Sequence, residues 1–399
     1  MNRWLALLLL AIPAALIARS LNASPLLTFI LAALGIVPLA GLIGQSTEAL
    51  AEHLGQGIGG LLNATFGNAA EIIIGLTALA AGLPEVVQAS IAGSIIGNVL
   101  LVLGSAMLIG GWRYRSQQFQ PRIAGQYAAM LALAVIGMAI PSLLATIGES
   151  THPGAVIVRG VELHELSVGV AIILLLCYAA YIAYSVFGLR ASKEDMLSQA
   201  VSSSENVTEE KSDIVHTKAA EKNEAVTLKQ KENRAPLSRI AAWWKTTLWF
   251  PIVVLAVATA VTAIMSEALV GSIEPLTHQI GLSPFFVGLI ILPIVGNAAE
   301  HFSAITSAYH NHMEITMAIT SGSSIQIALL AAPILVLFGA LIGVPLDLNF
   351  PLFEVVLFAL AAALFALISL DGESTWLEGL LLCAFYLILA VSTFFTPIA

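Results

Sequence analysis

Residues 67–71 read GNAAE, and the same five residues return unchanged at 296–300, which is 229 positions later. The spacing persists beyond the motif, because ten of the 28 positions from 67 to 94 are identical to those 229 residues further on. A self-match at one fixed spacing, without a gap, indicates a duplicated structural unit. We therefore expect the chain to consist of two related halves.

The composition indicates that a lipid bilayer surrounds both halves. Of the 399 residues 58% are hydrophobic and only 10% are charged, and the mean hydropathy is +0.92. Soluble domains carry roughly 25% charged residues, so water would solvate this surface poorly. The two cysteines, Cys177 and Cys383, lie inside apolar runs and are interpreted as small core residues rather than as a disulfide or thiolate site.

Eleven apolar stretches are long enough to cross a membrane as helices. Six precede a polar segment and five follow it. Because the runs are continuous rather than alternating, helices are favoured over the strands of a membrane barrel. The predicted class is an all-α membrane protein with eleven transmembrane helices. The predicted spans lie near 4–18, 25–45, 57–82, 86–110, 123–147, 164–188, 246–270, 283–309, 315–343, 351–370 and 376–396.

The order of the spans predicts that the two halves are inverted. Glu71 lies in the third predicted span and Glu300 in the eighth, so the two GNAAE helices cross the membrane in opposite directions. Secondary transporters built from inverted repeats bind their substrate near the midplane, where the halves meet. A polar linker at 190–243 is predicted to separate the two halves.

The charge distribution predicts the orientation and favours a cation as the substrate. From Arg190 to Lys245 there are ten Lys or Arg and nine Asp or Glu, whereas the rest of the chain holds six against 16. An acidic membrane region suits a cation carrier better than an anion carrier. Basic residues favour the cytoplasmic side, so we expect the N-terminus and the linker there.

The linker itself is mixed in charge and lacks aromatic residues from 190 to 240, so it is predicted to be mostly disordered, with a partly helical regulatory element as the alternative. The first span has a signal peptide as its alternative reading. The expected location is a multi-pass position in a membrane, most simply a prokaryotic cell membrane.

The GNAAE motifs carry the chemistry. A carboxylate inside an apolar helix costs about 2.5–3.5 kcal/mol on insertion scales, yet one stands at each equivalent place. The glycines allow a helix break that frees carbonyls, and oxygens of Glu, Asn and the backbone are ligands for a hard cation such as Ca²⁺. No Lys or Arg lies in a span where it could neutralise them; close helix packing is the alternative. The predicted ligands are Glu71, Glu300, Asn68, Asn297, Gly67 and Gly296.

Polar residues on the following spans are expected to support this site. An amide in lipid needs partners, which makes Asn98 and Gln326 the stronger candidates. Serine on a membrane helix often bonds its own backbone instead, and that alternative stays open for Ser94, Ser323 and Ser324.

Acidic residues at the ends of spans have two interpretations: solvated helix termini, or a vestibule that concentrates cations. The candidate vestibule residues are Glu48, Glu52, Glu85, Glu267, Glu274 and Glu314. Glu48, Glu52 and His53 follow the second predicted span at roughly helical spacing. Glu162, His164 and Glu165 are interpreted as a wet helix start rather than as a surface metal contact.

Four stretches resemble the calcium/proton exchanger (CAX) family of the cation/Ca²⁺ exchanger superfamily. They are GGLLNATFGNAAEIIIGL (Gly59–Leu76), VVQASIAGSIIGNVLLVLG (Val86–Gly104), GNAAEH (Gly296–His301) and GSSIQIAL (Gly322–Leu329). The resemblance implies that Glu71 and Glu300 bind Ca²⁺ and exchange it for protons, and that His301 corresponds to the family's repeat-two histidine and takes part in proton coupling. It also implies an extra N-terminal helix at 1–20 outside two five-helix repeats at 21–189 and 244–399. The turn AAGLPEVV departs from the family's usual loop, so nothing is carried over there.

The expected function is secondary active antiport of Ca²⁺ and H⁺ by alternating access, with Ca²⁺ as substrate and no cofactor. A Na⁺/Ca²⁺ or Mn²⁺/H⁺ exchanger, and more distantly a cation channel, remain alternatives. We expect no enzyme activity, because neither a nucleophile–base pair nor an HExxH motif is present, and no nucleic-acid binding. Whether copies form a homo-oligomer stays open.

Overall fold

The computed structural model describes residues 3–54, 62, 65–151, 161–205 and 248–395, and this part of the chain is almost entirely helical. The first half comprises α1 (Arg3–Leu8), α2 (Ala11–Ser20), α3 (Pro25–Leu54), α5 (Ala69–Ala80), α6 (Pro84–Gly97), the π-helical turn η1 (Asn98–Val102), α7 (Leu103–Tyr114), β1 (Ser116–Gln118), α8 (Pro121–Thr151) and α9 (Val161–Glu205). The second half comprises α12 (Trp249–Val270), α13 (Ile273–Ile280), α14 (Pro284–Phe286), η2 (Val287–Ile291), α15 (Leu292–Gly296), α16 (Ala298–Tyr309), α17 (Met313–Gln326), η3 (Ile327–Ala331), α18 (Ala332–Ile342), α19 (Leu352–Ile368), β2 (Glu373–Thr375) and α20 (Trp376–Phe394).

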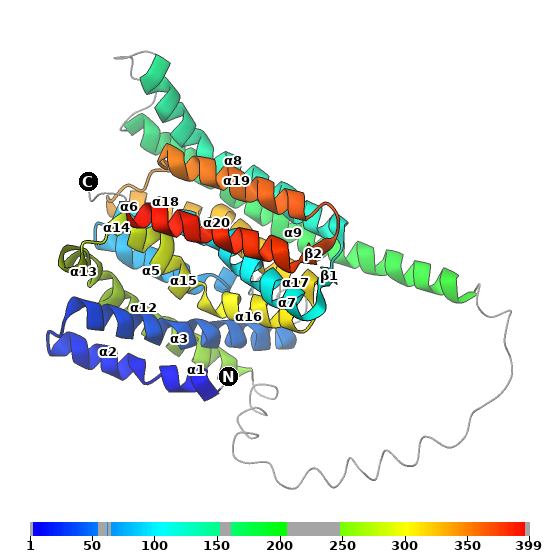
Figure 1. The fold of residues 1–399 in the computed structure, drawn as a ribbon, viewed down its shortest axis with the longest axis horizontal. Helices are drawn as coiled ribbons and strands as arrows, with labels where there is room; N and C mark the ends of the chain where they lie inside the picture. Colours follow the sequence, from blue (N-terminus) through cyan, green and yellow to red (C-terminus); the bar gives the residue numbers. More distant parts are fainter. Residues whose placement is uncertain (1–2, 55–61, 63–64, 152–160, 206–247, 396–399) are drawn as a thin grey trace, which may run out of the picture.

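The helices form a layered bundle (Figure 1). The pairs α1–α2 and α3–α12 lie on one side, and α8, α9 and α19 lie on the other, with α5 to α7, α15 to α18 and α20 between them. The two short strands pair antiparallel, with Ser116 opposite Thr375, and join the end of α7 to the start of α20. The motif-bearing helices α5 and α16 thus lie in the middle layer.

Seven helices of the described part are long and apolar enough to cross a membrane. The pair Pro284–Gly296 and Ala298–Tyr309, bent by 60° at its break, has the composition of one further span. Large apolar side chains such as Leu133 and Ile173 are exposed on the outer helices, as expected of a surface that faces lipid. The prediction of an all-α membrane protein is confirmed, whereas the count of eleven spans stays a prediction.

The duplicated sequence has a duplicated local structure. Helices α5 and α16 begin and end at positions 229 apart, and so do α6 and α17. The π-helical turns η1 and η3 are also 229 positions apart. The turn η1 directly follows α6, and η3 directly follows α17. Such turns often mark functional sites, because they interrupt the regular ladder of helical hydrogen bonds.

At Gly93, the backbone of α6 packs directly against the second half of the chain. A Cβ atom at this position would overlap the backbone carbonyl of Leu289 in η2, whereas a Cβ at the equivalent Gly322 would meet nothing within 4 Å. We therefore expect Gly93→Ala to destabilise the protein by about 1–3 kcal/mol, and Gly322→Ala to leave its stability unchanged. Thermal unfolding of both purified variants in detergent measures the difference. Equal melting temperatures would contradict this packing.

The polar segment differs in part from expectation. Helix α9 continues past residue 189 as far as Glu205, so residues 190–205 are helical and extend beyond the other helices (Figure 1). From Ala191 to Glu205 the sequence contains neither Gly nor Pro, and nothing in it ends a helix. Residues 190–205 therefore agree with the partly helical alternative rather than with disorder, and the rest of the predicted linker lies outside the described residues.

Candidate cation-binding site

The two GNAAE motifs meet at helix breaks in the middle of the bundle. Glu71 lies in the first turn of α5 and Glu300 in the first turn of α16, where the helix dipole favours a carboxylate. The Asn of each motif occupies the break itself, and both Asn side chains are buried. Gly296 leaves room for the other motif, since a Cβ there would lie 3.1 Å from Cγ of Glu71. The predicted motif residues of the two halves are therefore brought together.

Each motif Asn contacts the serine that follows the other motif. Asn297 Nδ2 donates a hydrogen bond to Ser94 Oγ over 3.2 Å. In the equivalent contact, Ser323 Oγ lies 3.1 Å from Asn68 Oδ1. Both pairs join one half of the chain to the other, which explains why Asn is needed at the break and a small hydroxyl residue opposite it.

Ser323 connects most of the predicted supporting residues. Its hydroxyl lies 2.6 Å from Glu300 Oε2, and it accepts a hydrogen bond from Asn98 Nδ2 over 2.9 Å. A hydroxyl has one proton to donate, and the short distance indicates that Ser323 donates it in a hydrogen bond to the Glu300 carboxylate. Asn68 Nδ2 in turn donates to Gln326 Oε1 over 2.5 Å. The amides Asn98 and Gln326 thus both belong to the network around the motifs.

Two predicted residues lie less centrally. Ser324 Oγ donates to the carbonyl of Thr320 in its own helix over 3.0 Å, which is the backbone-bonding alternative raised for membrane serines. His301 follows Glu300 on α16 and is half-buried, but it does not line the large cavity described below. Its coupling role stays a prediction.

The two carboxylates differ in their surroundings. Glu300 is bonded by Ser323, whereas both oxygens of Glu71 are buried and have no hydrogen-bond partner among the described residues. Glu71 is also close enough to Glu300 to be repelled by its charge. Two unneutralised carboxylates in such a place are costly, because burying a charge without a partner forfeits its hydration. A bound cation, or a proton on each, removes that cost.

A cavity of about 1470 Å³ leads to this site. Its walls include Glu300, Ser323 and Gln326 from the site, and the exposed carboxylates Glu48 and Glu314. Gly67 and Gly296 also line it. Two exposed carboxylates thus line the same cavity as the motif residues.

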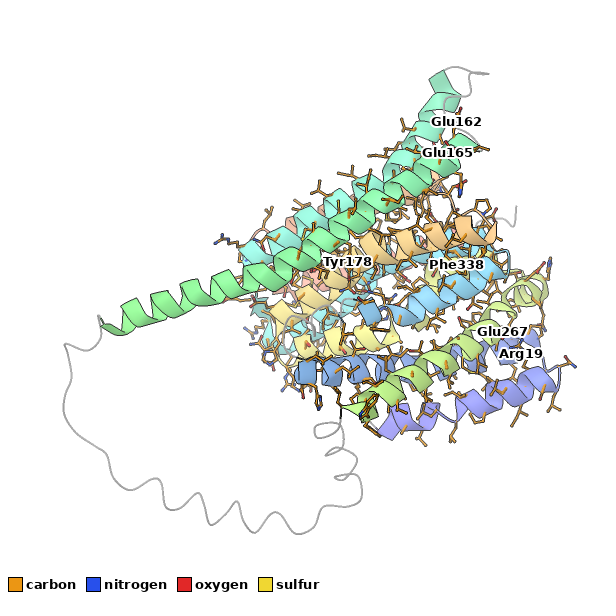
Figure 2. All side chains as sticks on the ribbon, turned by 180° about the vertical axis from the view of Figure 1, so that it is seen from behind. Arg19, Glu162, Glu165, Tyr178, Glu267 and Phe338 are labelled. Atoms are coloured by element: carbon orange, nitrogen blue, oxygen red, sulfur yellow. The ribbon has the colours of Figure 1, made fainter. Side chains whose placement is uncertain are left out.

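The other vestibule candidates do not share this cavity. Glu85 lines a second, smaller cavity, and Glu52 and Glu274 line neither of the two. Glu267 of α12 forms an exposed ion pair with Arg19 of α2, 2.7 Å apart (Figure 2). Glu48 and Glu314 therefore share a cavity with the motif residues, whereas Glu52, Glu267 and Glu274 do not, and the vestibule role of all the candidates stays a prediction.

The start of α9 behaves mainly as a solvated helix end. Glu162 and Glu165 are exposed there (Figure 2). His164 is different, because its Nδ1 lies 2.9 Å from Oδ1 of Asp347 in the connection between α18 and α19. In the described ranges no three or more His, Cys, Asp or Glu side chains are grouped so that they could hold a metal ion.

One buried acid escaped the sequence-based prediction. Glu354 of α19 is fully buried, and neither of its oxygens has a hydrogen-bond partner in the described part of the chain. The available signal was a lone carboxylate inside the apolar run 351–370, but it has no duplicate in the other half. A motif search based on the repeat therefore passes over it.

A helical bundle with a duplicated acidic break and a cavity leading to it is the architecture of a membrane ion exchanger. The chain belongs to the sodium/calcium exchanger protein family, whose model matches residues 24–187 and 250–395. These two matched segments lie on either side of the polar segment, and both include a GNAAE motif.

Within this family, the chain is similar to relatives that are named Ca²⁺/H⁺ antiporters. The chain is 40% identical to a Ca²⁺/H⁺ antiporter of Aphanothece halophytica over 98% of this chain and 96% of the relative. It is 42% identical to a Ca²⁺/H⁺ antiporter of a Synechocystis strain over 92% of this chain and 91% of the relative. The solved Ca²⁺/H⁺ antiporter protein YfkE is 32% identical and superimposes with a TM-score of 0.73 over 99% and 100% of the two chains. The resemblance to calcium/proton exchangers is confirmed.

Proposed function

We propose that this chain is a secondary active antiporter that exchanges Ca²⁺ for H⁺ across a membrane, with Glu71 and Glu300 binding Ca²⁺ or protons in competition. One observation carries the proposal: two carboxylates from duplicated motifs meet inside the bundle, with the oxygens of Glu71 buried and Glu300 half-buried, and no basic side chain of the described residues bonds to either. Two relatives are named Ca²⁺/H⁺ antiporters, which supports Ca²⁺ and H⁺ as the two exchanged ions.

The oxygens around the motifs suit Ca²⁺. This ion takes six to eight oxygen ligands at about 2.3–2.6 Å. Glu71 and Glu300 supply two negative charges, and the neutral oxygens come from the Asn, Gln and Ser side chains with carbonyls near Gly67 and Gly296. Only two charged ligands among many neutral ones favour binding that is reversible. Neutralising both carboxylates with protons then releases the ion, which gives an exchange of about two H⁺ per Ca²⁺.

Two cavities related by the repeat support alternating access. The smaller cavity, of about 380 Å³, is lined by Pro84, Glu85, Ala89 and Asp347, among others. The residues 229 positions away from these four are Met313, Glu314, Ala318 and Gln118, and all four line the large cavity. In an inverted repeat such cavities face opposite sides of the membrane. Closing the large cavity and opening the small one would then carry the ion across.

The proposed topology accounts for all eleven predicted spans. The bent pair ending in α16 and the shorter apolar helices Ala6–Ser20, Ala69–Ala80 and Leu352–Ile368 would cross or enter the membrane with the seven longer ones. We place the N-terminus in the cytoplasm, so that the second half of α3, which lines the large cavity, ends there. Inward proton flow would then drive Ca²⁺ out of the cytoplasm.

Ion flux in proteoliposomes tests the function. We expect Ca²⁺ uptake to follow an imposed pH gradient, to saturate with Ca²⁺, and to be accompanied by proton movement in the opposite direction. Mn²⁺ and Na⁺ supplied in parallel decide between the rival exchangers, because the ligand set barely separates Ca²⁺ from Mn²⁺. Ca²⁺ uptake driven by Na⁺ but indifferent to pH would assign the chain to Na⁺/Ca²⁺ exchange, and unsaturable flux without counter-transport would assign it to channels.

Ser323 provides a milder test of the site. Ser323→Ala removes the hydrogen bond to Glu300 and the acceptor of Asn98, and a hydrogen bond to a charged group contributes about 1.5–3 kcal/mol. We expect the Ca²⁺ concentration for half-maximal transport to rise by about tenfold or more. Ser324→Ala, one position along the same helix, is the matched control and should leave it unchanged. Equal effects of the two variants would remove Ser323 from the site.

A further inference from the structure

Glu354 is a buried acid that the proposed exchange site does not use. It lies in the first turn of α19 with an exposed fraction of 0%, and both of its oxygens lack a hydrogen-bond partner among the described residues. Buried carboxylates are normally paired or bonded, because an isolated ionised carboxylate loses its hydration when buried. With no such partner, the ionised form of Glu354 would be costly here, so burial favours the neutral, protonated carboxyl.

Glu354 is one of the residues that line the smaller cavity. Glu85, Gln88, Asp347 and Asn349 also line that cavity, so it is polar and can hold water when it widens. Gln88 Nε2 donates to the backbone carbonyl of Asp347 over 2.6 Å, which fixes one wall. Water in this cavity would be the first solvent that Glu354 meets.

No charged group nearby neutralises Glu354. From α6 the titratable neighbour is Glu85, and from the connection before α19 it is Asp347, whose carboxylate is already bonded by His164 of α9. Helix α14 contributes Phe285 to the cavity, and η1, which also packs against α19, has no titratable residue.

The described side chains of α8 complete these surroundings. Ser142 of α8 lies at the end of α19 that carries Glu354. Its hydroxyl accepts a hydrogen bond from the backbone N–H of Phe350. Arg122 and Tyr127 stand at the start of α8, which lies at the other end of α19, where a Cβ at Gly372 would contact Pro121. The other titratable side chains that line the smaller cavity are therefore both acids, Glu85 and Asp347.

Glu354 has no equivalent acid in the first half of the chain. The position 229 residues before Glu354 is Gly125, which is exposed and has no side chain to titrate. The duplicated cation site consequently has no second copy of this carboxyl. Its place in the first turn of α19 also matters, because the helix dipole favours the ionised form there once water supplies hydration.

We propose that Glu354 is a proton-binding site of the smaller cavity, protonated while that cavity is closed and ionised when the cavity opens to water. On opening, the O–H bond breaks and the proton passes to cavity water; on closing, a proton from that water returns to the carboxylate. This inference rests on the proposed antiport. In the transport cycle, the protonation state of Glu354 would then change with the opening and closing of the smaller cavity. The pH on the side of the smaller cavity then sets how readily that cavity closes.

The test uses the full chain in proteoliposomes, with the pH varied on one side at a time. The side of the smaller cavity is identified by labelling Glu85→Cys with an impermeant thiol reagent. We expect the wild type to lose rate as the pH on this side rises, because Glu354 stays ionised and holds the cavity open. Glu354→Gln should continue to exchange Ca²⁺ for H⁺ but lose the part of this dependence that Glu354 adds to that of Glu71 and Glu300. Glu85→Gln, an exposed acid of the same cavity, should keep it.

The outcomes separate the two proposals. A wild type without Ca²⁺/H⁺ exchange contradicts the antiport itself, whatever Glu354 does. An active Glu354→Gln variant with the wild-type pH dependence overturns the role of Glu354 and leaves the antiport standing. If the Gln variant is monodisperse but inactive, Glu354→Asp decides: exchange with the pH dependence retained supports the proton site, and an inactive Asp variant overturns it in favour of a packing role.

Discussion

Replacing Glu71 by Gln is expected to abolish coupled Ca²⁺ and H⁺ transport, with a loss of at least about 100-fold. The substitution keeps the shape of the side chain and breaks no hydrogen bond seen in the structure, because neither oxygen of Glu71 has a partner among the described residues. What it removes is one of the two negative charges that hold Ca²⁺ and one of the two groups that can take a proton. Glu300→Gln should have a comparable effect.

Transport of ⁴⁵Ca²⁺ into proteoliposomes under a pH gradient measures this loss. Glu52→Gln is the matched control, since Glu52 is an exposed acid of α3 that lines neither cavity, and it should behave as the wild type does. The interpretation of the motifs fails if Glu71→Gln transports Ca²⁺ at the rate of the Glu52→Gln control.

A second large effect is expected in the sidedness of labelling. Glu85 and Glu314 occupy equivalent positions at the starts of α6 and α17, both are exposed, and each lines a different cavity. If the halves are inverted, the two residues face opposite sides of the membrane. With Cys177 and Cys383 both replaced by Ala, an impermeant thiol reagent should label Glu314→Cys from one side only and Glu85→Cys from the other side only.

Sealed vesicles of known orientation, treated first outside and then after permeabilisation, make this an all-or-none measurement. Labelling of both positions from the same side would show that α6 and α17 start on one face of the membrane. The two halves would then be parallel, and the assignment of the cavities to opposite sides would be lost.

The sequence was most informative where the chemistry is duplicated. A carboxylate in an apolar span is costly at any single position, and its repetition 229 residues later predicted the residues that the structure brings together. Asn98 and Gln326 followed from the same reasoning, because a buried amide needs partners and both have them. Family membership followed from these stretches as well.

What the sequence did not reveal depends on contacts between distant parts of the chain. Glu267 is one of many acids at a helix end until the fold places Arg19 beside it. Ser323 and Ser324 are adjacent and alike in sequence, and only the orientation of α17 makes one a partner of Glu300 and the other a partner of its own backbone. Glu354 has no duplicate, so the repeat that revealed Glu71 could not reveal it.

The central claim is that protons and Ca²⁺ compete for Glu71 and Glu300, and the most direct measurement is the number of protons released when Ca²⁺ binds. Titration of the purified protein in detergent with Ca²⁺ in weakly buffered solution, with a pH dye, counts them at a pH where the empty site is protonated. We predict about two protons per Ca²⁺ for the wild type and none for the double variant Glu71→Gln, Glu300→Gln. Ca²⁺ binding without proton release in the wild type would contradict the account.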